Sequence, residues 1–205
     1  MLRTHRRRSL TFLAALGLGM LLSSAATTAH ATTAEPSPEA PPEAASELIW
    51  TADPSPAGVE AAQARSEAFS AAADPVTWAG CGVGVDPQKV VRSFPQGKIL
   101  RCGNANFGYF HIKAGHQGDW ESKSALTGQN WRDVADIGIN GALASPEVVK
   151  DRPSNDSKCY SRKIYLVNTQ NNQTVGTTIV RFAAGVRSNN IITAFPATGH
   201  CTGNE

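Results

Sequence analysis

The sequence predicts an α+β domain in which N-terminal helices pack on a C-terminal antiparallel sheet, a meander of at least three strands. Two segments with helical spacing of apolar residues come first, within residues 104–144. Three segments rich in β-branched and aromatic residues follow, and asparagine-rich turns separate them. Helices followed by a run of strands are typical of this fold class.

Three helices are expected. Asp86 followed by proline predicts a short helix over 86–92, because aspartate can accept from the first free amides and proline suits the first helical position. The aromatic residues of "NANFGYFHIKAGH" predict a second helix that ends at Gly115. Apolar residues at helical spacing predict a third helix over 128–144, with Thr127 as its cap.

The strands are predicted by composition and by the turns between them. The segments "CYSRKIYLVN", "QTVGTTIVRFAAG" and "NIITAFP" are rich in β-branched and aromatic residues. "NTQNNQ" and "VRSNN" lie between them and suit tight turns. We therefore expect antiparallel strands joined by hairpins.

The start of the chain is typical of a secretory signal peptide. Residues 1–31 combine an arginine-rich start, an apolar run and small residues before the expected cleavage site after Ala31. The apolar run, 10–22, is short for a membrane span, so we expect a secreted, extracellular protein without membrane attachment after cleavage. The arginines at 6–8 leave both the general secretory route and the twin-arginine route open.

Residues 32–75 differ in composition from the rest of the chain. They are rich in alanine, proline, serine and glutamate and poor in large apolar side chains. Such a segment buries too little surface to offset its chain entropy, so we expect a disordered linker or propeptide with at most a short helix over 58–73. Residues 76–205 are expected to form one domain that folds without this segment.

The charge is divided unevenly between these two parts. Residues 32–75 carry eight acidic side chains and one basic one, whereas residues 76–205 carry fourteen basic and nine acidic ones. A cationic domain favours polyanionic partners such as nucleic acid, although a surplus of this size also suits an ordinary soluble surface.

All four cysteines lie in the expected domain. An even number of cysteines in an exported chain indicates two disulfides, for which three pairings exist. We favour Cys81 with Cys102 and Cys159 with Cys201, because the second pair flanks strands expected to be neighbours. A zinc site is the alternative, but the sequence contains no CxxC motif.

The stretch "GYFHIKAGHQGDW" holds two of the five histidines of the chain, His111 and His116. Helical residues five apart lie about 140° apart around the axis, so this pair cannot clamp an ion as residues four apart can, and we expect no metal site. The chain also lacks a GxSxG nucleophile motif, and its cysteines are expected to be oxidised. Nucleophilic hydrolysis is therefore disfavoured.

Acid–base chemistry without a metal or cofactor fits the two histidines better. One imidazole can take the 2′-hydroxyl proton of RNA while a second protonates the leaving 5′-oxygen, and a nearby cation holds the phosphate. The alternative is structural: His111 as a core residue, His116 as an exposed loop residue, Lys113 on a solvated face and Trp120 in the core.

The segments "FHIKAGH", "NWRD", "YSRKIYLVN", "VGTTIVRF" and "IITAFP" together resemble the barnase, EndoU, colicin D and RelE-like group of ribonuclease toxin domains. The resemblance covers about residues 104–197, in pattern and element order rather than in close identity. It implies an endoribonuclease that acts without metal and leaves a 2′,3′-cyclic phosphate.

The resemblance also implies roles for four residues. His111 takes the place of the helix histidine that acts as acid or base, and His116 that of a second histidine. Arg132 matches a phosphate-binding cation, and Thr193 matches a hydroxyl on the last strand. Phe195 stands where relatives often carry a tyrosine, so His116 or Lys113 would have to replace that phenol.

The sequence also indicates candidate substrate contacts and partners, with less detail than it gives for the four catalytic candidates. Lys113, Lys163, Arg181 and Phe195 are candidate substrate contacts. The expected partner is RNA, with tRNA as one candidate, and a cognate immunity protein is a second candidate partner for a monomeric toxin. The alternative function is that of a non-enzymatic extracellular binding or inhibitor domain on the same scaffold.

Overall fold

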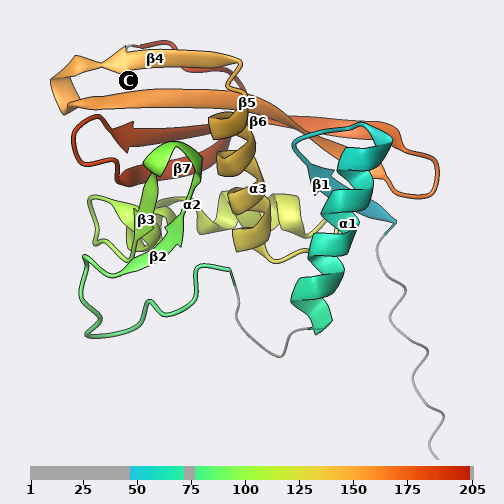
Figure 1. Cartoon of the computed structure of the whole chain (residues 1–205), viewed down its shortest axis with the longest axis horizontal. Helices are drawn as coiled ribbons and strands as arrows, with labels where there is room; N and C mark the ends of the chain where they lie inside the picture. Colours follow the sequence, from blue (N-terminus) through green and yellow to red (C-terminus); the bar gives the residue numbers. More distant parts are fainter. Residues whose placement is uncertain (1–46, 72–76, 204–205) are drawn as a thin grey trace, which may run out of the picture. The chain divides into compact units, whose positions relative to one another are not determined.

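The structure, a computed structural model, describes residues 47–71 and 77–203. The expected signal peptide and residues 32–46 lie outside this part of the chain. The described residues form an α+β fold with three α-helices, one five-stranded antiparallel sheet and a separate two-stranded hairpin (Figure 1). The expected fold class is therefore confirmed, although its strict order of helices before strands is not.

The three predicted strands form the body of the sheet. They are β5 (Ser157–Asn168), β6 (Gln173–Gly185) and β7 (Ile191–Ala197), and they pair antiparallel in sequence order. Their asparagine-rich turns lie where the sequence places them: Asn172 and Asn189 both have a positive φ, which asparagine tolerates better than most residues. The predicted meander is confirmed.

Two further strands lie along the other edge of β5, and neither was predicted. β4 (Val148–Arg152) pairs with the first half of β5, and β1 (Leu48–Thr51) pairs with its second half. β4 is largely exposed and β1 has only four residues, so neither has a long alternating pattern to reveal it.

β1 and the helix after it correct the expectation for residues 32–75. α1 (Pro56–Ala71) follows β1 directly and contacts it, which matches the short helix expected over 58–73. Trp50, on β1, is only 2% exposed and belongs to the main core, where its indole nitrogen donates to the carbonyl of Lys123. Residues 48–71 are therefore part of the fold and not a disordered linker.

The helix expected over 86–92 is also wrong. Asp86 accepts a hydrogen bond from the amide of Gln88, but the chain makes only a turn there. It then enters β2 (Val90–Ser93), which pairs with β3 (Ile99–Arg101) across a 3₁₀ turn over Pro95–Gly97. The β-branched pair at 90–91 favours a strand, and this preference outweighs the capping signal.

α2 (Gly108–Ser124) continues nine residues beyond the predicted end at Gly115. Gly115 is exposed within the helix, and the residues on the inner face hold the helix together across it. Ile112 and Trp120 are fully buried in the core, and the Trp120 indole donates to the carbonyl of Ala194. Packing on both sides of the glycine therefore offsets its low helix propensity.

α3 (Trp131–Ala144) lies within its predicted range, but its cap is Asn130 and not Thr127. The Asn130 side chain accepts from the amide of Arg132. Asp136 of α3 is buried and accepts from the indole of Trp78 and from the guanidinium of Arg92. These bonds fasten the segment before β3 to the helix.

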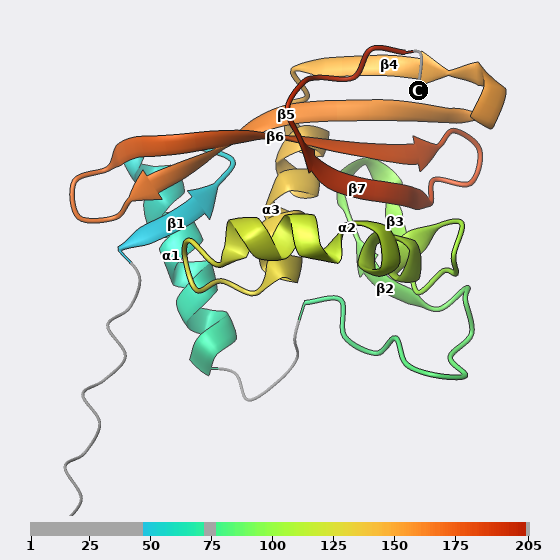
Figure 2. The ribbon, with the colours of Figure 1, turned by 180° about the vertical axis from the view of Figure 1, so that it is seen from behind.

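The core lies between the helices and one face of the sheet (Figure 2). The paired residues Tyr160, Phe182 and Ala194 form a row across β5, β6 and β7 on this face, and all three belong to the core. Side chains alternate between the two faces of a strand, so their neighbours Ser161, Arg181 and Phe195 form a second row on the opposite face. β7 is an edge strand, and α2 runs beside it.

Both favoured disulfides are present. Cys81 is bonded to Cys102, just before α2, and Cys159 of β5 is bonded to Cys201 in the segment that follows β7. The second bond holds the C-terminal segment across the sheet. None of the described helices is long and apolar enough to cross a membrane.

Candidate active site

The two histidines of α2 lie side by side near the edge of the sheet. The ring centroids of His111 and His116 are 6.1 Å apart, and the rings meet edge to face. Both side chains are partly buried. The structure therefore brings these two candidate residues together.

Each histidine uses its Nδ1 atom in a contact within its own segment. Nδ1 of His111 lies 2.7 Å from the carbonyl oxygen of Ala105, and Nδ1 of His116 lies 3.3 Å from a carboxylate oxygen of Asp119. A carbonyl or carboxylate oxygen only accepts, so in both rings Nδ1 carries the hydrogen. The Nε2 atom of each ring is then the one that can take up or release a proton toward a ligand.

A phenylalanine and an arginine from the sheet complete this side of the cluster. The Phe195 ring stacks on His116 with a centroid separation of 4.7 Å and an interplanar angle of 25°. The guanidinium carbon of Arg181 lies 5.4 Å from the centroid of the same phenylalanine ring. Arg181 and Phe195 are direct partners in the β6–β7 register, so the sheet itself places the cation against the phenylalanine ring on which His116 stacks.

Thr193 lies two residues before Phe195 and therefore on the same face of β7. Its hydroxyl oxygen is buried and has no hydrogen-bond partner in the described structure. A buried hydroxyl without a partner costs about 1–3 kcal/mol, so such groups are uncommon unless a ligand satisfies them. We define His111, His116, Arg181, Thr193 and Phe195 as the histidine–arginine cluster.

Two arginines, Arg181 and Arg152, influence each other electrostatically at this face of the sheet. Burial lowers the pKa of the Arg181 guanidinium, and the nearby charge of Arg152 lowers it further. An arginine remains protonated at neutral pH despite such a shift, so Arg181 carries its positive charge at this face of the sheet. No group of three histidine, cysteine, aspartate or glutamate side chains within residues 47–71 and 77–203 is arranged to hold a metal ion.

Two other residues predicted for the site lie apart from the cluster. Arg132 donates to the hydroxyl of Tyr109 at 2.6 Å and packs over the rings of Tyr109 and Trp131. No described contact joins it to either histidine. Lys113 is exposed on α2. Arg181, unlike Arg132, contacts the Phe195 ring on which His116 stacks.

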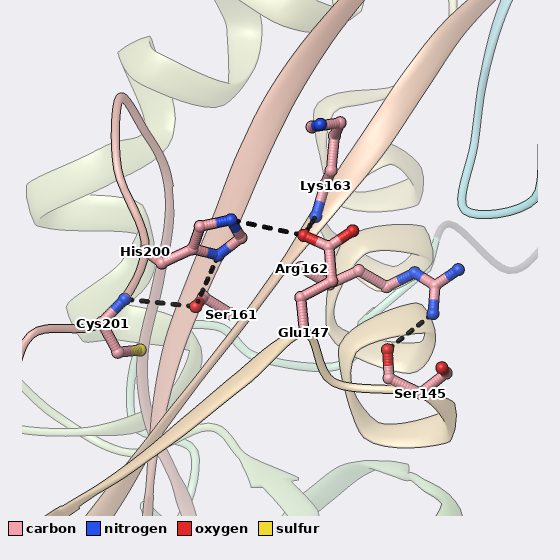
Figure 3. A network of polar contacts seen from close by, with 7 residues as sticks. All are labelled: Ser145, Glu147, Ser161, Arg162, Lys163, His200 and Cys201. Atoms are coloured by element: carbon pink, nitrogen blue, oxygen red, sulfur yellow. Dashed lines mark hydrogen bonds and ion pairs between the residues drawn. The ribbon is translucent and has the colours of Figure 1, made fainter.

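The structure adds a third histidine that the sequence prediction missed (Figure 3). His200 lies 3.1 Å from the hydroxyl oxygen of Ser161 through Nδ1 and 3.3 Å from a carboxylate oxygen of Glu147 through Nε2. Ser161 is fully buried and also accepts from the backbone amide of Cys201. Together with the neighbouring disulfide, these contacts hold the C-terminal segment against β5.

The contact between His200 and Ser161 lies on the strand next to Arg181 of the cluster. Ser161 is the direct strand partner of Arg181, which is in turn the partner of Phe195. Adjacent strands lie about 4.8 Å apart, so Arg181 is placed between the Ser161–His200 contact on one side and the Phe195–His116 contact on the other. The alternation of β5 and the favoured Cys159–Cys201 pairing were the signals that could have located His200 at this face.

Comparisons with known proteins identify relatives without a described activity. No protein-family model matches the chain. Rv0739 of Mycobacterium tuberculosis strain H37Rv and MT0764 of strain CDC 1551, both named as uncharacterized proteins, are each 37% identical to the chain over 141 residues. The matches cover 60% of this chain and 51% of each relative. The chain thus spans about half the length of the curated relatives it matches.

Proposed function

We propose that the protein is a secreted, toxin-like endoribonuclease that cleaves RNA at the histidine–arginine cluster without a metal ion. The observation that carries this proposal is the pair of histidine rings 6.1 Å apart, one of which stacks on Phe195. The sheet adds Arg181, which contacts the same phenylalanine, and the buried Thr193 hydroxyl without a partner, two residues away on β7. Two proton-transfer groups, one fixed cation and one unoccupied donor are the groups that cleavage of a phosphodiester requires.

In the proposed reaction, the 2′-oxygen of RNA attacks the adjacent phosphorus while the bond from phosphorus to the 5′-oxygen breaks. Nε2 of one histidine takes the proton of the 2′-hydroxyl, and Nε2 of the other gives a proton to the leaving 5′-oxygen. The products are a 2′,3′-cyclic phosphate and a free 5′-hydroxyl. The RNA and the two histidines supply every atom of these products.

Asp119 distinguishes the roles of the two histidines. Its carboxylate faces Nδ1 of His116 and stabilises a positive charge on that ring, whereas His111 faces a neutral carbonyl. We therefore assign His116 as the acid and His111 as the base. Arg181 and the Thr193 hydroxyl would contact the non-bridging phosphate oxygens, where charge builds up in the transition state.

Secretion and an RNA partner belong to the same proposal. Two disulfides are typical of proteins that fold in an oxidising compartment, and the signal-peptide pattern of residues 1–31 agrees with export. The surplus of basic residues over 76–205 favours a polyanion as substrate.

The experiment that tests the proposal is RNA cleavage by the secreted protein in the presence of a chelator. Total RNA and isolated tRNA should both be offered, and the new 3′ ends should be identified by mass spectrometry. We expect cleavage products that carry a 2′,3′-cyclic phosphate. Products that carry a linear 3′- or 5′-phosphate from the first step would contradict attack by the 2′-oxygen.

A substrate with sulfur in place of the scissile 5′-oxygen tests the two histidine roles separately. A thiolate leaves without protonation far more readily than an alkoxide, because an ordinary thiol has a pKa of about 8.5. We expect this substrate to restore cleavage by His116→Ala but not by His111→Ala. Restoration of His111→Ala alone would reverse the assignment.

A further inference from the structure

A polar pocket of about 480 Å³ opens beside the histidine–arginine cluster, where β7 ends. α2 contributes Ser122 and Lys123 to it, β5 contributes Lys163, and β6 contributes Thr177 and Thr178. Its volume is within the range of pockets that hold small molecules, and hydroxyl groups and ammonium groups dominate its polar lining.

The two lysines give this pocket its preference for anions. Lys123 and Lys163 are both partly buried, and neither takes part in the ion pairs found among the described residues. Asp119 also lines the pocket, but its carboxylate contacts His116. The lining therefore carries two positive charges from different elements against one negative charge, and this surplus attracts an anionic group of a ligand.

The pocket is continuous with the cluster along β7. Pro196 and Ala197 line the pocket and directly follow Phe195, which stacks on His116. A strand rises about 3.3 Å per residue, so the pocket begins within about 7 Å of the stacked pair. The pairing of β6 with β7 ends at the Ile179–Ala197 pair, so the part of β6 that precedes Ile179 has no partner on the β7 side. The end of β7 therefore leaves space between α2 and β6.

We propose that this pocket binds the next nucleotide along the RNA, one phosphate beyond the cleaved phosphodiester. Lys123 and Lys163 would hold its phosphate, and the hydroxyls of Ser122, Thr177 and Thr178 would contact its sugar or base. The inference rests on the proposed function, because it names the part of the RNA that lies beyond the reacting phosphate. It makes a substrate of several nucleotides bind more tightly than a dinucleotide.

Binding of oligonucleotides that cannot be cleaved tests the pocket without relying on activity. The full secreted chain should be titrated with labelled 2′-O-methyl oligonucleotides of two and of six nucleotides, at several salt concentrations. Lys123→Gln and Lys163→Gln should each weaken binding of the hexanucleotide by about threefold to tenfold. Each should also reduce the steepness of the plot of log binding constant against log salt concentration by about 0.7, the value for one lost phosphate contact on a single strand.

Arg187→Gln is the matched control, because it removes one positive charge from the turn at the far end of β6 and β7. This arginine is 85% exposed and pairs with Asp156, so its loss should leave hexanucleotide binding unchanged. If both lysine variants bind the hexanucleotide with the parental affinity and salt slope, or if the parent binds no oligonucleotide, the inference is wrong.

The outcomes separate this inference from the proposed function. If binding depends on the two lysines while the parent fails to cleave RNA, the pocket is a nucleotide site and the ribonuclease proposal fails. If the parent cleaves RNA and the lysine variants bind and cleave the hexanucleotide as the parent does, the ribonuclease proposal stands and the pocket has no part in it.

Discussion

The ring of His116 stacks on the ring of Phe195, and this contact joins α2 to the edge strand of the sheet. The chemistry of this partner matters for the proposed function, because the proposed resemblance to ribonuclease toxins places Phe195 where a tyrosine is often found. A phenylalanine ring cannot donate a proton. It can orient a histidine that does, and Asp119 fixes the same imidazole through Nδ1.

Replacement of Phe195 by alanine should therefore slow RNA cleavage through a misplaced His116. A displacement of a catalytic group by about 1 Å can cost about a hundredfold, so we expect a loss of about tenfold to a hundredfold in kcat. Phe195→Tyr retains the ring and should cleave at close to the parental rate. Equal rates for the alanine and tyrosine variants in single-turnover assays would show that the stacking is irrelevant to the reaction.

Gly115→Ala tests whether α2 continues through the predicted helix end. A Cβ atom at Gly115 would meet no other atom within 4 Å, and the residue lies inside the helix. Alanine should therefore raise the free energy of unfolding by about 0.5–1 kcal/mol, as expected for an exposed glycine in a helix interior. A glycine that ends the helix with a positive φ would instead make the alanine variant less stable in urea titrations.

Trp50→Ala tests whether the N-terminal strand belongs to the fold. Trp50 is 2% exposed and packs in the main core, so its truncation should cost about 3–5 kcal/mol. Val175→Ala is the control, because Val175 is 56% exposed on β6 and should change stability by less than about 0.5 kcal/mol. A chain shortened to residues 77–205 should be destabilised like Trp50→Ala, and parental stability of that fragment would exclude β1 and α1 from the fold.

The Cys159–Cys201 disulfide closes the longer of the two loops, with a sequence separation of 42 against 21 for Cys81–Cys102. Loop-closure entropy then predicts a loss of about 4 kcal/mol for the double variant C159A/C201A and about 3 kcal/mol for C81A/C102A. Thermal unfolding of both variants checks the order. Before these measurements, mass spectrometry of the unreduced parent should find no free thiol, and any alkylatable cysteine would contradict the pairing.

The parts of the fold that could be predicted are those whose signal is local and long. β5, β6 and β7 have β-branched residues over long segments with asparagine turns between them, and α3 has a regular apolar face. β1 has only four residues and follows a proline-rich segment. Its place in the sheet depends on pairing with Asn168 and its neighbours, more than a hundred residues away, and no local pattern reveals that.

The residues of the candidate site also divide into those that the sequence could indicate and those that only the structure places. His111 and His116 could be named from their closeness in the sequence, and Thr193 and Phe195 from the resemblance, but a spacing of five residues on a helix does not by itself bring two rings together. Arg181 could be named as a candidate, but only the β6–β7 register places it beside Phe195. Arg132 was assigned by resemblance, and the structure places it against Tyr109 instead, because the start of α3 packs on the inner side of α2.

The central claim is that His111 and His116 cleave RNA by acid–base catalysis, and the rate of His111→Ala in the presence of a chelator tests it most directly. Loss of a general acid or base costs about 10²- to 10⁴-fold, so cleavage of a ribo-hexanucleotide should fall by that factor. The melting temperature should stay near the parental value, because the ring is only partly buried and its neighbour Ile112 carries the core contact. Cleavage by His111→Ala at the parental rate would contradict the account and favour a binding domain over an enzyme.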